Sequence, residues 1–312
     1  MTGKTRIAVL GAGFIGLNLV RRLLRDGYSV SVLDHKPAPD DVAGRVSWVR
    51  GEFADQSAVA AALEKSDCAI HLVSSTVPGD EHVDPTRELS DNIFATLEFL
   101  KTCERVQVPR VVFSSSSSVY GLQERVPIPE TAITDPISSH GIQKLAIEKY
   151  LLLHRFNSGL DVRIARLSNP YGPGQRVGGR QGFVAITIGH LLKKERILLR
   201  DEGRPVRDFI YIDDVVDAFT RLATLPRAPT VVNVGFGTGH SLRQVIDLMA
   251  GLIGRPVDAD VGAARRSDIP VSVLDVGLAA REIGFAPIVP MHEGLARTLR
   301  HHGIPVTENT RG

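Results

Sequence analysis

A run of serines and a spaced histidine–lysine pair are the residues whose chemistry stands out in this chain. Residues 114–118 are five serines that follow the apolar segment 111–113, so their hydroxyl groups stand at the end of a predicted buried strand. Further along, His140 precedes Lys144 by four residues at the predicted start of a helix. Residues four apart lie on one face of a helix, so both side chains can reach one pocket. A hydroxyl group, a titratable ring and a cation in one pocket suit the oxidation of an alcohol.

A glycine-rich turn between a strand pattern and a helix pattern predicts a dinucleotide site. Residues 6–10 are apolar, and Gly11, Gly13 and Gly16 follow them in a Gly-x-Gly-x-x-Gly motif. The first glycine permits a tight turn, the second lets the backbone approach a pyrophosphate, and the third lets helix and strand pack closely. The pyrophosphate would lie at the helix N-terminus, where free N–H groups point at it.

Asp34 ends the next predicted strand, eighteen residues after Gly16. A carboxylate at this position accepts hydrogen bonds from the adenosine ribose and repels a 2′-phosphate, which favours NAD over NADP. His35 and Lys36 follow directly, and their positive charge would weaken this preference. The predicted cofactor is NAD.

Strand and helix patterns alternate along most of the chain. Strands are expected at residues 6–10, 29–33, 46–49, 68–73, 111–113, 162–167 and 230–234. Helices are expected from Gly16 to Gly27 and at residues 57–63, 86–105, 140–156, 215–225, 242–252 and 278–283. Apolar strands that alternate with helices predict an α/β fold, a doubly wound parallel sheet with ligands at the carboxyl ends of its strands.

Composition limits the classes of function. The chain has 312 residues, 43% hydrophobic content and a net charge of +2, which argue for a globular protein and against a dedicated nucleic-acid binder. Two cysteines, Cys68 and Cys103, predict core residues in a reducing compartment rather than a disulfide framework. Without an apolar stretch of about 18 residues, we expect a cytoplasmic protein with no membrane contact. No metal site is predicted.

Residues 114–121, Ser-Ser-Ser-Ser-Ser-Val-Tyr-Gly, resemble the SSSxxVYG segment of extended short-chain dehydrogenase/reductases, especially the nucleotide-sugar epimerases and dehydratases related to UDP-glucose 4-epimerase. The family continues with Tyr-Gly-x-x-Lys, whereas residues 140–144 read His-Gly-Ile-Gln-Lys, so His140 replaces the usual catalytic tyrosine. The resemblance extends from Gly11 to about Leu299. It implies a Rossmann NAD-binding domain, residues 1–167 plus about 208–236, and a smaller C-terminal nucleotide-sugar domain, residues 168–207 plus 237–312.

The resemblance also implies catalytic roles. Ser116, three residues before Val119, would hydrogen-bond the reacting sugar hydroxyl, and Lys144 would hold the nicotinamide ribose. We predict that His140 is the base, because the charge of Lys144 keeps its imidazole neutral and able to accept a proton. Its ring nitrogen lies closer to the backbone than a tyrosine oxygen would, so a bridging water or a relay through Ser116 would close the gap. The alternative is a loss-of-function change in which His140 only fills space.

Further contacts are carried over from the family. Those to the cofactor are implied for Phe14 and Ile15 at the pyrophosphate turn, Glu52 and Phe53 near adenine, and Leu72 and Asn92. Those to the nucleotide diphosphate and its ribose are implied for Asn169, Arg207, Arg265 and Asp268. Arginine suits this task because its guanidinium group binds phosphate through two parallel hydrogen bonds.

The predicted activity is epimerisation at C4 of a nucleotide sugar, of the UDP-hexose or UDP-hexosamine class, through a transient 4-ketosugar. Ser118 stands where related dehydratases and decarboxylases carry an acidic residue, which favours plain redox chemistry at C4. The alternatives are a reductase of nucleotide-linked 4-ketosugars and a catalytically silent binding protein. The family also implies a homodimer through the helices at residues 86–105 and 140–156.

Overall fold

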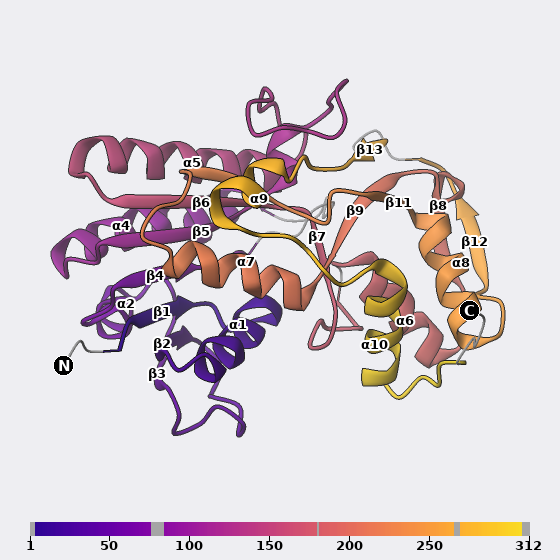
Figure 1. Cartoon of the computed structure of the whole chain (residues 1–312), viewed down its shortest axis with the longest axis horizontal. Coiled ribbons are helices and arrows are strands. Elements are labelled where there is room, and N and C mark those ends of the chain that lie inside the picture. The colour runs from indigo at the N-terminus through magenta and orange to yellow at the C-terminus, as the bar shows by residue number, and fades with distance from the viewer. Residues whose placement is uncertain (1–3, 76–83, 180, 265–268, 308–312) are drawn as a thin grey trace.

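A seven-stranded parallel sheet forms the larger part of the molecule (Figure 1). The computed structural model describes residues 4–75, 84–179, 181–264 and 269–307. In spatial order the strands are β10 (Val231–Val234), β6 (Asp161–Leu167), β5 (Arg110–Ser116), β4 (Cys68–His71), β1 (Arg6–Leu10), β2 (Ser29–Asp34) and β3 (Ser47–Arg50). All neighbouring pairs are parallel. The predicted doubly wound α/β fold is confirmed.

Helices cover both faces of this sheet because successive strand residues point to opposite sides. Ile7 and Val9 of β1 pack into a core with α1 (Phe14–Arg25) and α7 (Ile212–Thr224). The intervening Ala8 faces the other core. That second core is covered by α2 (Gln56–Leu63), α4 (Ala95–Arg105) and α5 (Ser139–Ser158).

The helix predicted over residues 86–105 is divided in the structure. It consists of α3 (Pro85–Leu89), a π-helical turn η1 (Ser90–Phe94) and α4. The wider π turn carries Asn92, whose buried amide is hydrogen-bonded to three other segments. Periodicity along the sequence does not reveal such a turn, because two of these partners, Ser75 and Gln143, are distant in the chain.

A smaller lobe lies at one end of the molecule (Figure 1). Its central strand β9 (Val206–Tyr211) pairs with β7, β11 and β13, while β8 and β12 form a separate parallel pair. The strand bounds are β7 Asn169–Tyr171, β8 Ile197–Arg200, β11 Gly239–Ser241, β12 Ala259–Gly262 and β13 Val271–Ser272. The helix bounds are α6 Phe183–Lys193, α8 Leu242–Ile253, α9 Gly277–Ile283 and α10 Met291–His301, with α9 leading back toward α7. The sequence patterns do not predict α6 and α10.

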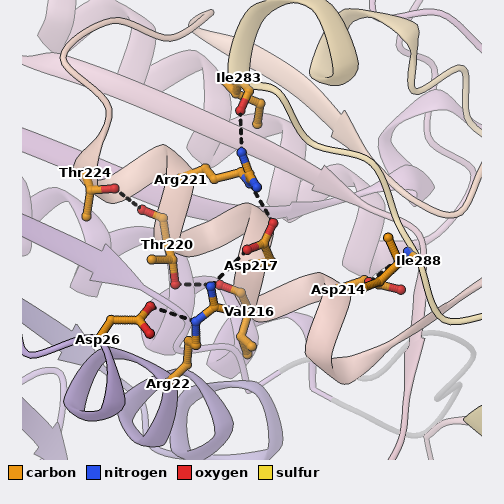
Figure 2. A network of polar contacts seen from close by, with 10 residues as sticks. All are labelled: Arg22, Asp26, Asp214, Val216, Asp217, Thr220, Arg221, Thr224, Ile283 and Ile288. Carbon is orange, nitrogen blue, oxygen red and sulfur yellow. Dashed lines mark hydrogen bonds and ion pairs between the residues drawn. The ribbon is translucent and has the colours of Figure 1, made fainter.

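Helix α7 ties separate parts of the chain together (Figure 2). Its Asp217 accepts a hydrogen bond from Arg22 of α1 at 3.1 Å and another from Arg221 at 2.6 Å. Arg221 also donates to the carbonyl of Ile283 at the end of α9. Asp214 accepts from backbone N–H groups of the segment that follows α9.

Among the described residues, no helix combines the length and the apolar character that crossing a membrane requires.

Candidate active site

A cleft of about 570 Å³ lies at the carboxyl ends of β1, β4 and β5, where the order of strands reverses. This switch point is where doubly wound sheets bind their ligands. The larger lobe contributes the predicted residues Gly11, Gly13, Phe14, Ile15, Gly16, Asp34, Glu52, Phe53, Leu72, Ser116, His140 and Lys144. The smaller lobe contributes Ser168, Pro170, Gln175, Arg176, Gly179 and Gln181.

The glycine turn has the shape that a pyrophosphate needs. A Cβ atom on Gly16 would lie 2.0 Å from the carbonyl oxygen of Gly11, so only glycine permits this approach of helix α1 to the turn. A Cβ on Gly13, by contrast, would meet no atom within 4 Å. Gly13 is the N-cap of α1 and offers no side-chain cap to the helix, so the first N–H groups are available to an anion.

Asp34 is fixed beside this turn by the backbone. Its Oδ2 accepts from the N–H of Ala12 at 2.7 Å and its Oδ1 from the N–H of Lys36 at 2.9 Å. Each carboxylate oxygen retains a further lone pair for a ligand hydroxyl. The ring of His35 lies close by, with Nδ1 3.4 Å from Oδ1, so a protonated histidine would reduce the net negative charge here.

Helix α5 brings Lys144 and His140 to the floor of the cleft. Ser138 caps the helix by accepting from the N–H of Gly141. Lys144 donates from Nζ to the carbonyl of Ser114 at 2.8 Å, and burial lowers the pKa of its ammonium group to about 8. Burial and the neighbouring Lys144 lower the pKa of the His140 imidazole to about 3. His140 is therefore neutral near pH 7.

Ser116 ends β5 and faces the same cleft. Its Oγ accepts a hydrogen bond from the N–H of Ser118 at 3.2 Å and lies 2.9 Å from the Oγ of Ser118. The hydroxyl of Ser115 is bound instead to Glu148, which forms a buried ion pair with Arg166 at 2.7 Å. The adjacent side chains of Ser115 and Ser116 therefore have different hydrogen-bond partners.

These residues together form a crevice that runs from the glycine turn to a hydroxyl, an imidazole and an ammonium group at the other end. A family model described as the NAD dependent epimerase/dehydratase family matches residues 7–235. The chain belongs to this family. NAD, predicted from the glycine motif and Asp34, is the cofactor in the family's description, so the cofactor prediction is confirmed. The open space at Gly13 and the fixed carboxylate of Asp34 fit its pyrophosphate and ribose.

Relatives in this family match nearly the whole chain. UDP-glucose 4-epimerase from Mycolicibacterium smegmatis is 32% identical over 307 residues, covering 94% of this chain and 97% of that protein. The structure of UDP-glucose 4-epimerase from Thermotoga maritima with UDP-glucose superposes with a TM-score of 0.89 at 30% identity, covering 96% and 99%. The structure of UDP-glucose 4-epimerase from Thermus thermophilus with NAD superposes with a TM-score of 0.87 at 30% identity, covering 95% of this chain and 98% of that chain. The relatives also include dTDP-glucose 4,6-dehydratases and a UDP-glucuronic acid decarboxylase, so membership in this epimerase/dehydratase family leaves the reaction open.

Several predicted residues of this family member do not line the cleft. Asn169 donates from its amide to the carbonyl of Asp208 at 3.0 Å. Arg207 donates from Nη1 to the carbonyls of Val206 and Ile269. Their contacts to a substrate stay predictions. Arg265 and Asp268 lie outside the described residues.

Asn92, a predicted cofactor contact, does not line the cleft and belongs instead to a polar cluster that includes Gln143 of α5. Its amide group bonds Ser75 and the side-chain oxygen of Gln143, both at 2.9 Å. Gln143 and Ser139 each donate to one carboxylate oxygen of Glu88 at 2.7 Å. Ser139 and Gln143 flank His140 in α5, so this cluster holds the helical turn that carries the histidine.

Some functional candidates are not singled out by the sequence patterns. Gln175, Arg176 and Gln181 face the cleft from the smaller lobe. Residues 168–175 are rich in glycine and proline, a composition typical of a loop, but composition does not show which side chains of a loop face a cleft. Asn18 of α1 donates to the carbonyl of Pro173 at 3.1 Å and so helps to place that loop.

Proposed function

We propose that this protein is an NAD-dependent 4-epimerase of a UDP-hexose or UDP-hexosamine. The observation that carries the proposal is the convergence of Ser116, His140 and Lys144 at one end of a crevice that begins at the glycine turn. Ser118 carries no acidic group, so dehydration and decarboxylation lack the carboxyl group that we expect for them. The likeness to UDP-glucose 4-epimerases over nearly the whole chain supports the same choice.

NAD, when bound, supplies the group that accepts a hydride from C4 of the sugar and returns it. His140 takes the proton of the O4 hydroxyl as C4 becomes a ketone, and it gives that proton back to O4 when C4 is reduced. Burial and Lys144 lower the pKa of the imidazole to about 3, so the ring accepts the proton as a weak base and returns it readily. Ser116 donates a hydrogen bond to O4, and Lys144 holds the nicotinamide ribose. The cycle is balanced in protons and electrons.

The neutral state of His140 supports epimerisation over net ketosugar reduction. A reductase needs a proton donor at O4 at the start of its cycle, and a group with a pKa of about 3 does not carry that proton near pH 7. An epimerase begins with oxidation, which requires the unprotonated ring. The predicted contacts of Asn169, Arg207, Arg265 and Asp268 with the nucleotide diphosphate and ribose complete the proposal for the substrate.

The test is incubation of the purified protein with a panel of UDP-, dTDP- and GDP-sugars, with C4 configuration read by proton NMR. We expect a UDP-sugar to reach a mixture of both C4 epimers without consumption of added reduced cofactor. Stoichiometric loss of NADH or NADPH with a nucleotide-linked 4-ketosugar contradicts the epimerase and supports a reductase.

His140→Ala should lower the kcat of epimerisation at least 100-fold, because it removes the proposed base. Activity that appears only in His140→Tyr means that the natural chain is a binding protein.

We also propose a homodimer through α4 and α5. A hollow of about 370 Å³ lies between these helices, and exposed apolar side chains line it. Phe94 is 62% exposed and Leu153 is 52% exposed. A second copy of the same face would cover them.

Light scattering with size-exclusion chromatography should give the mass of a dimer for the natural protein and that of a monomer for Leu153→Glu. Leu198→Glu, at an equally exposed leucine on β8, is the control that should remain dimeric.

A further inference from the structure

The hydroxyl group of Ser116 is held by its neighbour Ser118. Its Oγ accepts from the backbone N–H of Ser118 at 3.2 Å, and the Oγ of Ser118 lies 2.9 Å away, also within hydrogen-bond distance. A serine hydroxyl has one proton to donate and two lone pairs that accept. When Ser116 donates its proton to a substrate oxygen, Ser118 must be the donor in the bond between the two hydroxyls. Both lone pairs of Ser116 are then occupied.

We propose that Ser118 is a positioning residue that makes Ser116 an obligate hydrogen-bond donor to O4 of the sugar. This inference rests on the proposed function, because it assigns O4 as the partner of Ser116. With both lone pairs occupied, Ser116 does not accept the O4 proton. That proton goes to His140 directly or through a water, and a relay through Ser116 is closed. The chain Ser118–Ser116–O4 stabilises the ketone and the developing alkoxide at C4.

The position of Ser118 is itself fixed by the catalytic helix. Ser118 lies in the 3-10 turn η2 (Ser117–Tyr120), and Ser116 is the N-cap of that turn. A Cβ atom on Gly141 would lie 2.6 Å from the carbonyl oxygen of Ser118, so the backbones of η2 and α5 are in close contact there. Gly141 adjoins His140. The donor to O4 and the acceptor of its proton therefore share one rigid frame.

Capping alone would explain the bond from the N–H of Ser118, because serine oxygens commonly accept from the N–H two residues ahead. It does not explain the second bond between the two hydroxyls. Polarisation along a chain of hydroxyls strengthens the terminal donor, which gives the second bond a catalytic effect. Loss of the Ser118 hydroxyl should therefore slow turnover while the backbone cap remains.

The test compares Ser118→Ala and Ser118→Thr with the unchanged protein, using the UDP-sugar that epimerises. We expect Ser118→Ala to lower kcat about tenfold with KM changed less than about twofold, and Ser118→Thr to restore most of kcat. Ser117→Ala is the matched control, because Ser117 does not line the cleft, and it should leave both constants unchanged. Unchanged kcat in Ser118→Ala overturns the inference. So does a threonine variant that performs no better than alanine despite an equal melting temperature and NAD content.

A structural readout separates this inference from the proposed function. In crystals of the natural protein with NAD and a UDP-sugar, we expect the two hydroxyls to stay within about 3.2 Å while Ser116 contacts O4. A Ser118 hydroxyl turned away from Ser116 in that complex overturns the inference, whether or not the sugar is epimerised. Absence of any C4 epimer in the panel, with the hydroxyl chain intact on O4, contradicts only the proposed function.

Discussion

Gly13 and Gly16 belong to one motif, but the lack of a side chain has a different consequence at each position. The space around Gly13 is open, and its φ of −74° suits any L-residue, so its lack of a side chain serves the ligand. At Gly16 the obstacle is the carbonyl of Gly11, so the lack of a side chain serves the fold. The same motif thus combines a binding requirement with a packing requirement.

Alanine at these two positions should give opposite results. Gly13→Ala should fold with an unchanged melting temperature and lose the NAD-dependent stabilisation, which is about 2.7 kcal/mol at a hundredfold excess over Kd. Gly16→Ala should lose roughly 3 kcal/mol or more of unfolding free energy, because its methyl group overlaps a backbone oxygen. Thermal melts with and without NAD measure both effects. An NAD-dependent shift that survives in Gly13→Ala would contradict the placement of the pyrophosphate.

Two buried histidines make the fold sensitive to acid. Burial lowers the pKa values of both His71 and His140 to about 3, from about 6.5 in an unfolded chain. Between these values the unfolded chain binds more protons, so stability falls as the pH falls from 6.5 toward 3. At pH 5 each histidine accounts for about 2 kcal/mol of this loss, at 1.36 kcal/mol per pH unit.

His140→Gln should therefore lose less unfolding free energy than the natural protein between pH 6.5 and pH 5, as measured by urea titrations. The exposed His292→Gln should behave like the natural protein, and a His140→Gln that does so too would contradict burial of a neutral ring.

At the scale of elements, helix α5 is held by a buried carboxylate from another helix. Glu88 of α3 accepts from Ser139 and Gln143, on either side of His140 along α5. Both donors are neutral, so removal of the carboxylate leaves the buried amide of Gln143 and the exposed hydroxyl of Ser139 without this partner. The first turn of α5 then loses its side-chain anchor to α3, while the bond between Asn92 of the π turn and Gln143 remains.

Glu88→Ala should lower the free energy of unfolding by about 2–3 kcal/mol. We also expect kcat to fall, because the turn that carries His140 is no longer held. Urea unfolding and steady-state kinetics measure the two effects. Glu98→Ala removes an exposed carboxylate that pairs with Lys101, and it should change stability by less than about 0.5 kcal/mol. Equal effects of the two substitutions would mean that the buried cluster does not anchor the helix.

The sequence predicts the elements whose signals are local. The order of strand, glycine turn, helix and Asp34 follows from spacing alone, and the seven-stranded sheet bears it out. The π turn at Asn92 depends on hydrogen bonds to Ser75 and Gln143, which come together only in the folded chain. The side of the loop on which Gln175 lies depends likewise on packing between the lobes. Site residues set by long-range contacts were therefore beyond the reach of pattern and spacing.

At the scale of the whole molecule, helix α1 and the loop at Pro173 that leads into the smaller lobe are in direct contact. Asn18 of α1 donates to the carbonyl of Pro173, and a Cβ on Gly174 would lie 3.3 Å from the same amide. The next residue, Gln175, lines the cleft. We therefore expect a dinucleotide bound at the start of α1 to stabilise this loop as well, which predicts coupled binding of NAD and the nucleotide sugar.

We expect NAD to tighten UDP binding about tenfold, and UDP to tighten NAD binding by the same factor, because coupling free energies are reciprocal. Asn18→Ala should weaken this coupling, because it removes the hydrogen bond between α1 and the loop at Pro173. Each ligand alone should bind nearly as before, because the substitution changes neither binding site. Calorimetric titrations of each ligand, with and without the other, measure all four affinities. Gly13→Ala is the matched control, since its UDP affinity should equal that of the NAD-free protein and no longer respond to NAD. Coupling of full size in Asn18→Ala would show that it runs through another contact between the lobes.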